Sequence, residues 1–264
     1  MTDSESLRAV GLSHSYAVDR SERPVLREVD LEVRAGEAVC VVGHSGTGKS
    51  TLLRCLAGLL RPTEGEVRLA GRRVLEPPED LAVVFQDYSR SLMPWMSILD
   101  NVMLPLRRGV PAQERGLRAR KALADVGLDG TEKLYPWQVS GGMQQRVAIA
   151  RALAYRPGVL LMDEPFASVD AQTRADLEDM VLRIRRDTGI TMVVVTHDID
   201  EAVYLADRVV VLAGRPASIT ADLQVQLPPE RDQLTTKADQ RFLTVRAEVF
   251  RMIRTELAQA GSGR

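Results

Sequence analysis

The stretch Gly43–Thr51 (GHSGTGKST) has the residue types and the spacing of a loop that binds phosphate. Its glycines let consecutive backbone N–H groups turn inward around phosphate oxygens, a curl that larger side chains would block. Lys49 can neutralise the outer phosphates, and the Ser50 hydroxyl can bind magnesium. The residues predicted to bind nucleotide here are Gly43, His44, Ser45, Gly46, Thr47, Gly48, Lys49, Ser50 and Thr51.

A strand and a helix must position this loop. Glu37–Val42 is a short apolar run of strand type, and Thr51–Leu60 repeats apolar residues at helical spacing. The loop therefore joins a buried strand to a helix N-terminus, where unpaired N–H groups and the helix dipole attract an anion. The alternative is a glycine-rich turn that binds nothing, and the two flanks argue against it.

The segment Val159–Glu164 has residues suited to phosphoryl transfer. Its four apolar residues predict a buried strand that ends in Asp163 and Glu164, at the carboxyl edge where α/β sheets place ligands. Asp163 can bind magnesium, directly or through water, and Glu164 is placed to act as the general base on an attacking water. A solvated strand end is the alternative, but the acidic pair complements the upstream loop as phosphoryl transfer demands.

A second candidate anion site begins at Ser140. Gly141 and Gly142 open a predicted helix that runs to about Tyr155, so their N–H groups and the helix dipole can hold an anion. The Ser140 hydroxyl adds a donor at the cap. Because Ser-Gly-Gly is also a common helix start, this stretch alone leaves a plain helix cap open.

Composition limits the remaining possibilities. The 264 residues are 45% hydrophobic and 27% charged, with a formal net charge of -1, so we expect no broad basic surface and no nucleic-acid partner. The N-terminus MTDSESLRAV lacks the pattern of a secretory signal, and no apolar stretch is long enough to span a bilayer, so we expect the chain in the cytoplasm. Cys40 and Cys55 lack metal-ligand spacing and are expected to be core residues.

Alternating strand and helix signals predict an α/β fold. We expect one domain over 1–230, with a core at about 1–86 and 158–230 and a helical subdomain at about 87–157, followed by a C-terminal amphipathic helix and tail over 231–264. Short strands in Leu7–Glu37 and Glu66–Val74 predict an antiparallel flap. Further predicted helices are Gln113–Val126, Met143–Tyr155, Asp170–Arg186 and Ile199–Ala206, and further strands are Val159–Met162, Met192–Thr196 and Val209–Leu212.

Together these residues resemble the ATP-binding-cassette family, the ATPase subunits of membrane transporters, from Val10 to Ile219. Beyond the Walker A loop and the Walker B strand, the resemblance rests on the signature Ser140–Gln144, Gln86 of the Q-loop, Ala167–Asp170 of the D-loop and His197 of the H-loop, in the family's order. It implies a P-loop NTPase (RecA-like) core with an antiparallel β flap and an inserted α-helical subdomain. It also implies ATP and Mg2+ as ligands.

The resemblance gives roles to individual residues. Glu164, His197, Gln86 and Asp170 are implied to be catalytic, and Ser50, Gln86 and Asp163 to hold the metal. Ser140, Gly141, Gly142 and Gln144 are implied to grip the ATP of a second copy of the chain or of a paralogous cassette. Tyr16 matches the aromatic residue that stacks on adenine, although an ordinary strand aromatic is the alternative. By its position alone His197 would more often be a buried core histidine, and only the resemblance argues otherwise.

The resemblance also implies partners. Exporters of the family often fuse membrane spans to the cassette, so this chain is expected to serve an importer with separate permease subunits, on the cytoplasmic face of the membrane. The segment after Gln86, with Tyr88, Met93, Trp95 and Met96, is expected to contact the permease, and subdomain core is its alternative. SLMPW, PFASVDAQTR and THDIDEAVYLADRVVVL resemble the nitrate, sulfonate and taurine branch, which also uses an extracytoplasmic substrate-binding protein.

Other functions stay open at this stage. The chain could import a different small solute, or be a soluble ATPase that acts on ribosomes or DNA and is not coupled to transport. Such soluble proteins usually carry two cassettes or a long coiled-coil insertion, and this sequence shows neither. A regulatory module that senses ATP without hydrolysing it is a further alternative, against which the set Glu164, Gln86 and His197 argues.

Overall fold

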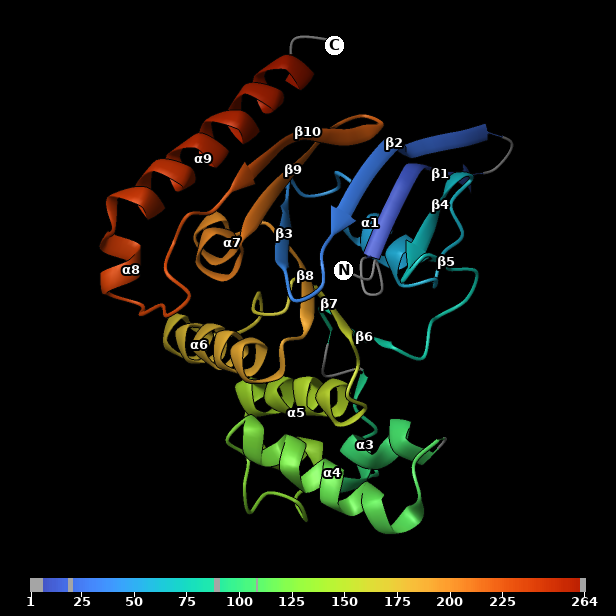
Figure 1. Cartoon of the computed structure of the whole chain (residues 1–264), viewed down its shortest axis with the longest axis vertical. Coiled ribbons are helices and arrows are strands. Elements are labelled where there is room, and N and C mark those ends of the chain that lie inside the picture. The colour runs from blue at the N-terminus through green and yellow to red at the C-terminus, as the bar shows by residue number, and fades with distance from the viewer. Residues whose placement is uncertain (1–6, 19–20, 88–90, 108, 262–264) are drawn as a thin grey trace.

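A parallel sheet lies at the centre of the part of the chain that the computed structural model describes, which is residues 7–18, 21–87, 91–107 and 109–261. Its strands, from one side to the other, are β9 (Arg208–Gly214), β3 (Ala38–Val42), β8 (Thr191–Thr196), β7 (Val159–Asp163) and β6 (Leu81–Val84). The predicted α/β fold with a P-loop core is confirmed (Figure 1). The short strand β6 is an element that the sequence pattern did not single out.

An antiparallel flap continues the same sheet. It contains β1 (Leu7–Val18), β2 (Ser21–Val33), β4 (Glu64–Leu69) and β5 (Arg72–Arg73), and β10 (Ala217–Gln224) joins it to β9. The prediction of short strands in the first part was wrong, because β1 and β2 form one long hairpin. Their pairing has register shifts between Ala9 and Ser15 but continues along the hairpin. The resulting strand order is β5-β4-β1-β2-β10-β9-β3-β8-β7-β6.

The central strands are buried on both faces. β3, β7 and β8 have no exposed position, which explains their continuous runs of apolar residues. Alternate residues of β3 enter different cores: Cys40 packs on one face of the sheet, whereas Val39 and Val41 pack on the other. Cys40 and Cys55 are free and buried, as predicted.

Helices cover both faces of the sheet. α1 (Lys49–Leu56) contacts β1, β2, β7 and β8, and α7 (Ile199–Leu205) contacts β3 and β8, with α6 (Ala171–Thr188) packed on α7. α1 ends before the predicted Leu60, because Gly58 adopts φ +69° and the following amides close back on the helix.

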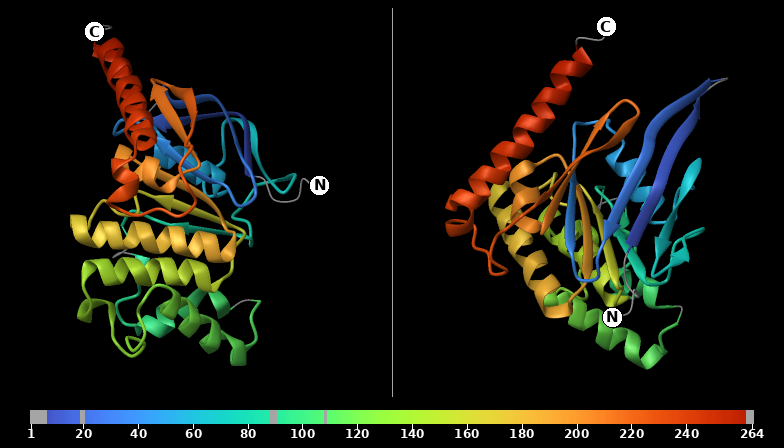
Figure 2. Two further views of the ribbon diagram at one scale, coloured as in Figure 1. Left: turned by 60° about the vertical axis from the view of Figure 1, so that its left-hand side comes forward. Right: turned by 45° about the horizontal axis from the view of Figure 1, so that its top comes forward.

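A helical segment separates β6 from β7 in the chain. It contains α3 (Ile98–Met103), η1 (Leu104–Arg107), α4 (Ala112–Asp125), η2 (Pro136–Gln138) and α5 (Gly141–Ala154). These helices lie below the sheet in Figure 1, and Figure 2 shows α5 and α6 side by side. We propose that this segment is the helical subdomain expected at about 87–157.

The C-terminal part contains α8 (Thr235–Ala238) and the long helix α9 (Gln240–Gly261). Phe242 and Val249 are buried, and Val245 and Ile253 are partly buried on the same side of α9, so this helix packs on the body of the molecule. α9 contacts α7 and β9. The predicted C-terminal amphipathic helix is thus present; the side chain of Leu257, which we also expected on its apolar face, lies outside the described residues.

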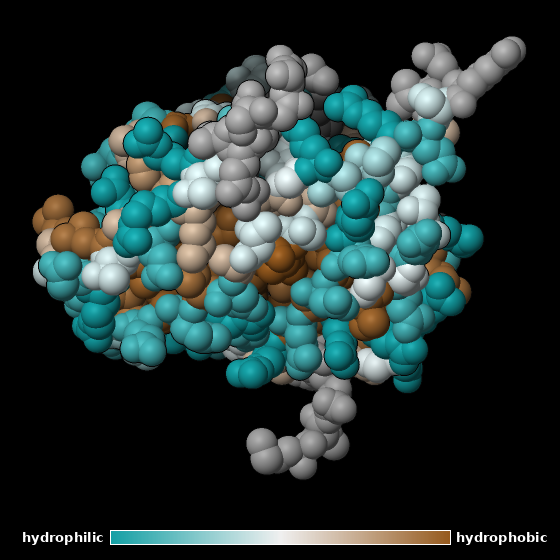
Figure 3. Space-filling view, turned by 90° about the horizontal axis from the view of Figure 1, so that it is seen from above, coloured by the Kyte–Doolittle hydropathy of each residue, from teal (hydrophilic) through white to brown (hydrophobic). Residues whose placement is uncertain are grey.

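The surface seen from above is mixed in character: hydrophilic side chains surround smaller hydrophobic patches (Figure 3). In the described part of the chain, no helix combines the length and the apolar composition that crossing a bilayer requires.

Two leucine-to-alanine changes test this assignment of the core. Leu161 in β7 is fully buried, whereas Leu117 on α4 is 67% exposed. Leu161→Ala should lower the free energy of unfolding by about 2–5 kcal/mol, because it leaves a cavity between packed layers. Leu117→Ala should change it by less than about 0.5 kcal/mol. Chemical denaturation measures both, and equal shifts would contradict the burial of β7.

Candidate active site

The turn between β3 and α1 closes around a lysine. Gly48 adopts φ +102°, and a Cβ there would lie 2.7 Å from a methyl carbon of Val25, so this position requires glycine. The buried Lys49 ammonium donates hydrogen bonds to the carbonyls of Gly43 at 2.9 Å and of His44 at 3.3 Å. The His44 side chain itself is exposed, so this residue contributes through its backbone.

The parallel register brings four strand ends together. Val42 of β3 pairs with Thr196 of β8, Asp163 of β7 pairs with Val195, and Val84 of β6 pairs with Met162. The residues that follow these strands are the phosphate loop, His197, Glu164 and Gln86. They meet at the carboxyl edge of the sheet, where α/β proteins bind ligands.

Glu164 is the centre of this meeting point. Its carboxylate accepts a hydrogen bond from Gln86 Nε2 at 3.1 Å, lies 3.1 Å from His197 Nδ1 and lies 3.9 Å from Lys49 Nζ. The backbone at Glu164 adopts φ +44°, and its N–H donates to the Val195 carbonyl at 2.7 Å. A bulky residue in this left-handed region is uncommon, and such strain clusters at functional sites.

Ser50 and Asp163 form a second polar pair beside Glu164. The Ser50 hydroxyl donates to Asp163 Oδ1 at 3.0 Å. Burial raises the pKa of Asp163, the Ser50 hydrogen bond opposes this shift, and the charge of Glu164 adds to it. Burial likewise lowers the pKa of Lys49, opposed by Glu164 and Asp163.

These two residues fit a magnesium ion. Both offer the hard oxygen ligands that magnesium prefers, and a cation would offset the cost of keeping the buried Asp163 charged. Among the described residues, no three His, Cys, Asp or Glu side chains gather as a metal cluster. A magnesium site here would therefore depend on Ser50, Asp163 and Gln86 together with the phosphates of the bound nucleotide.

The phosphate loop opens into a cavity of about 550 Å³. Tyr16, Arg23, Gln86 and Glu164 line it together with loop residues, and the Tyr16 hydroxyl lies 3.2 Å from Thr51 Oγ1. Arg23 is a residue that sequence reasoning missed. It reaches the site because β2 pairs it directly with Tyr16 of β1, and this register is invisible in a motif. Its cation adds to the attraction for phosphate.

The Ser140 stretch lies outside that cavity. Ser140 caps α5 and accepts a hydrogen bond from the Met143 N–H at 3.3 Å, while the Gln144 amide donates to the Pro136 carbonyl at 2.8 Å. A Cβ at Gly142 would lie 2.5 Å from Thr173 Cγ2, so glycine permits α5 to approach α6 closely. Ser140 and Gly141 are exposed at the end of a 14-residue helix.

Asp170 likewise does not line the cavity. It caps α6, where its carboxylate accepts hydrogen bonds from the Thr173 N–H at 3.0 Å and from the Thr173 hydroxyl at 2.6 Å. The hydrogen bond from the Thr173 hydroxyl lowers the pKa of Asp170 most, and the bond from the Thr173 N–H lowers it further. Thr173 therefore contacts both the aspartate cap of α6 and the glycine start of α5. The structure places Asp170 next to the Ser140 stretch and apart from the phosphate loop.

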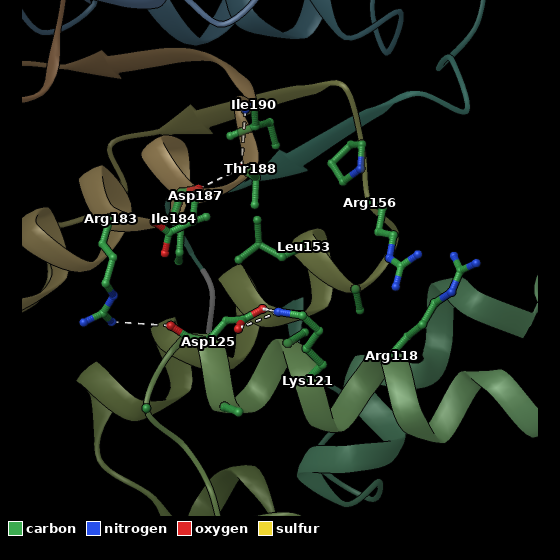
Figure 4. Close-up of a pocket in the computed structure, with 15 residues that line it drawn as sticks. Arg118, Lys121, Asp125, Leu153, Arg156, Arg183, Ile184, Asp187, Thr188 and Ile190 are labelled. Atoms are coloured by element: carbon green, nitrogen blue, oxygen red, sulfur yellow. Dashed lines mark hydrogen bonds and ion pairs between the residues drawn. The ribbon is translucent and has the colours of Figure 1, made fainter. Parts of the chain in front are cut away.

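A larger cavity, of about 800 Å³, lies among the C-terminal ends of α4, α5 and α6 (Figure 4). Each helix end carries about half a negative charge from its dipole. The cations and carboxylates of its lining are Arg118, Lys121, Arg156, Arg183, Asp125 and Asp187. The cations offset the two carboxylates and the three helix ends, so the lining favours neither anion nor cation, and we assign it no ligand.

Comparisons with known proteins agree with this geometry. Residues 26–167 match the family model described as ABC transporter. The chain is 44% identical over 255 residues to an uncharacterised ABC transporter ATP-binding protein of Methanocaldococcus jannaschii, covering 96% of this chain and 93% of that protein. It is 39% identical over 252 residues to the nitrate transport protein NasD of Klebsiella oxytoca, covering 94% of this chain and 95% of NasD.

A solved structure is also similar. It is the dimeric post-hydrolysis state of the ATP-binding cassette MJ0796 bound to ADP and Pi, with a TM-score of 0.74 and 32% identity, covering 84% of this chain and 100% of that one. Some relatives are much longer: the chain spans 35% of the nitrate import protein NrtC of Synechococcus elongatus and 35% of the bicarbonate transport protein CmpC of Synechocystis.

Lys49→Ala tests the phosphate site. If Lys49 binds the phosphates, removing its buried ammonium should weaken ATP binding by about 2–5 kcal/mol, which is at least 30-fold. Isothermal titration of the purified chain with ATP and magnesium measures the loss. Lys121→Ala is the matched control, because Lys121 is an exposed lysine on α4 that pairs with Asp125. Undiminished affinity in Lys49→Ala would rule out the assigned site.

Proposed function

Because this chain belongs to the ABC transporter family and is an ATPase of that family, we propose that it is the ATP-hydrolysing subunit of an importer for a small solute. Relatives that are named for nitrate and bicarbonate transport support this choice. We propose a small anion, such as nitrate, bicarbonate, a sulfonate or taurine, as the solute. An extracytoplasmic binding protein would deliver it to separate permease subunits.

The arrangement around Glu164 is the observation that carries the proposal. Glu164 acts as the base that accepts a proton from water, His197 and Gln86 orient that water, and Lys49 neutralises the outer phosphates. All three partners already contact or approach the Glu164 carboxylate. Ser50, Gln86 and Asp163 would hold magnesium, which would neutralise charge on the phosphates. Tyr16 and Arg23 line the part of the cavity that would hold the rest of the ATP molecule.

We further propose that two cassettes share each ATP. The phosphate loop of one chain already surrounds its own site, whereas the exposed start of α5 offers free N–H groups and the Ser140 hydroxyl to a partner. Asp170 lies next to that helix start through Thr173 and would reach the same interface. Gln144 supports the start of α5 from within, through the Pro136 carbonyl. The dimeric cassette structure, bound to ADP and Pi, supports this arrangement.

The segment after Gln86 is the proposed permease contact. Asn101 is fully buried and its side chain hydrogen-bonds the backbone of Met93, Met96 and Ser97, which fixes the loop. Trp95 on this loop is 73% exposed, whereas Val102 is core. An exposed tryptophan on a rigid support suits a protein partner. Tyr88, expected in the same surface, lies outside the described residues.

This contact implies a place in the cell. Permease subunits span the membrane, and the cassettes that energise them bind ATP, so we propose that the chain is peripheral on the cytoplasmic face. Gln86 would link the phosphate site to the docked permease, because it hydrogen-bonds Glu164 and begins the segment that carries Trp95.

Glu164→Gln tests the proposed chemistry. Glutamine keeps the size of the side chain but cannot take a proton, so hydrolysis should fall by about 10²- to 10⁴-fold while ATP still binds. Light scattering should then detect a stable dimer with ATP. Glu79→Gln, an exposed glutamate away from the site, is the control and should keep the parent rate. Parent-rate hydrolysis by Glu164→Gln would show that another group acts as the base.

A further inference from the structure

Two helices, α6 and α7, begin next to residues of the proposed catalytic site. α6 begins directly after Asp170, and α7 begins two residues after His197, with Asp198 as its N-cap. Asp198 Oδ1 accepts the N–H groups of Asp200 at 2.9 Å and Glu201 at 3.1 Å. His197 therefore lies between the end of β8 and the Asp198 cap of α7, so the position of this cap bears on where its side chain points.

An ion pair joins these helices at the end nearest the site. Arg174, in the first turn of α6, donates from Nη1 to Asp198 Oδ2 at 2.9 Å. The backbone N–H of Arg174 also donates a hydrogen bond to the Asp170 carbonyl at 2.9 Å. One arginine thus connects the turn that carries Asp170 to the cap that follows His197.

The C-terminal end of α7 is joined separately to the middle of α6. Tyr204 on α7 donates its hydroxyl to Asp179 on α6 at 2.6 Å. The C-terminal segment adds Gln233, whose amide bonds Asp179 at 2.9 Å, and Lys237, which bonds the buried Glu178 at 3.1 Å. With the end of α7 held to the middle of α6 in this way, loss of the Arg174–Asp198 pair would release the start of α7 and leave the helices packed.

The charges around Asp198 also favour a cation at this point. Glu201 is buried in the first turn of α7, and its Oε1 has no hydrogen-bond partner among the described residues. Burial raises the pKa of Glu201, and the charge of Asp198 adds to this shift. The positive charge of Arg174 offsets the negative charge of Glu201. The side chain of His197 is 53% exposed, so packing alone does not hold it.

We propose that Arg174 is a positioning residue for ATP hydrolysis: through Asp198 it holds the loop that presents His197 to Glu164. The inference rests on the proposed roles of His197 and Glu164. His197 Nδ1 lies 3.1 Å from the Glu164 carboxylate, and a displacement of about 1 Å at a catalytic group can cost about 10²-fold in rate.

Two single variants and their combination test this inference in the full chain. Arg174→Gln removes the cation, and Asp198→Asn removes the charge while keeping a residue that caps helices well. Each should lower kcat about tenfold with the KM for ATP within about twofold, and the double variant should lose no more than either single. Arg174→Lys should recover most of the rate, because it restores the charge.

Arg246→Gln is the matched control. Arg246 of α9 pairs with Asp200 on the first turn of the same α7, but from the side away from α6. This variant should keep the parent kcat. An unchanged kcat in Arg174→Gln and Asp198→Asn, a loss confined to KM, or an equal loss in Arg246→Gln would overturn the inference. Thermal unfolding identifies variants that fail to fold, and Asp198→Asn and Arg174→Lys then carry the test.

A His197→Ala background separates this inference from the proposed function. If Arg174 acts through His197, Arg174→Gln should cause no additional loss in that background. An additional tenfold loss would overturn the route through His197 while leaving the ATPase assignment intact. If His197→Ala alone hydrolysed ATP at the parent rate, the proposed role of His197 would fail, and this inference with it.

Discussion

The position of one carboxylate governs the site. Glu164 meets Lys49, Gln86 and His197, and each of these residues follows a different strand of the parallel sheet. Parallel pairing in register places those strand ends at one edge, and the burial of β3, β7 and β8 on both faces makes that register hard to shift. The bond from the Glu164 N–H to Val195 holds the backbone in its uncommon conformation. The core of the fold is therefore also what aligns the proposed chemistry.

The remaining residues of the proposed site face outward. Close packing of α5 on α6 at Gly142 and Thr173 puts the serine-capped helix start and the Asp170 cap side by side, outside the cavity that holds Lys49. In the proposed dimer these groups would complete the site of a partner. Arg174 of α6 bonds Asp198 at the start of α7 and so links this pair of helices to α7. The outward-facing groups and His197 therefore belong to one connected set of helices.

Much of this arrangement could be predicted from the sequence, because glycine spacing, apolar runs and helical periodicity are local signals. The loop at Lys49, the strand that ends at Asp163 and the helix after Ser140 all lie where the pattern placed them. Features that depend on pairing between distant segments could not be predicted from the sequence. β6 and β10 are too short or too mixed in pattern to stand out, and Arg23 enters the site only because of its register with Tyr16. The left-handed backbone at Glu164 likewise has no sequence signal.

The sharing of ATP between two chains is the central claim, and a mixing experiment tests it most directly. Ser140→Arg blocks the outward helix start, and Lys49→Ala disables the phosphate loop, so neither variant alone should hydrolyse ATP. A mixed dimer contains one intact site, built from the phosphate loop of the first variant and the serine helix of the second. We therefore expect the mixture to regain hydrolysis. A mixture that stays inactive although mixed dimers form, or parent-rate hydrolysis by Ser140→Arg alone, would contradict the account.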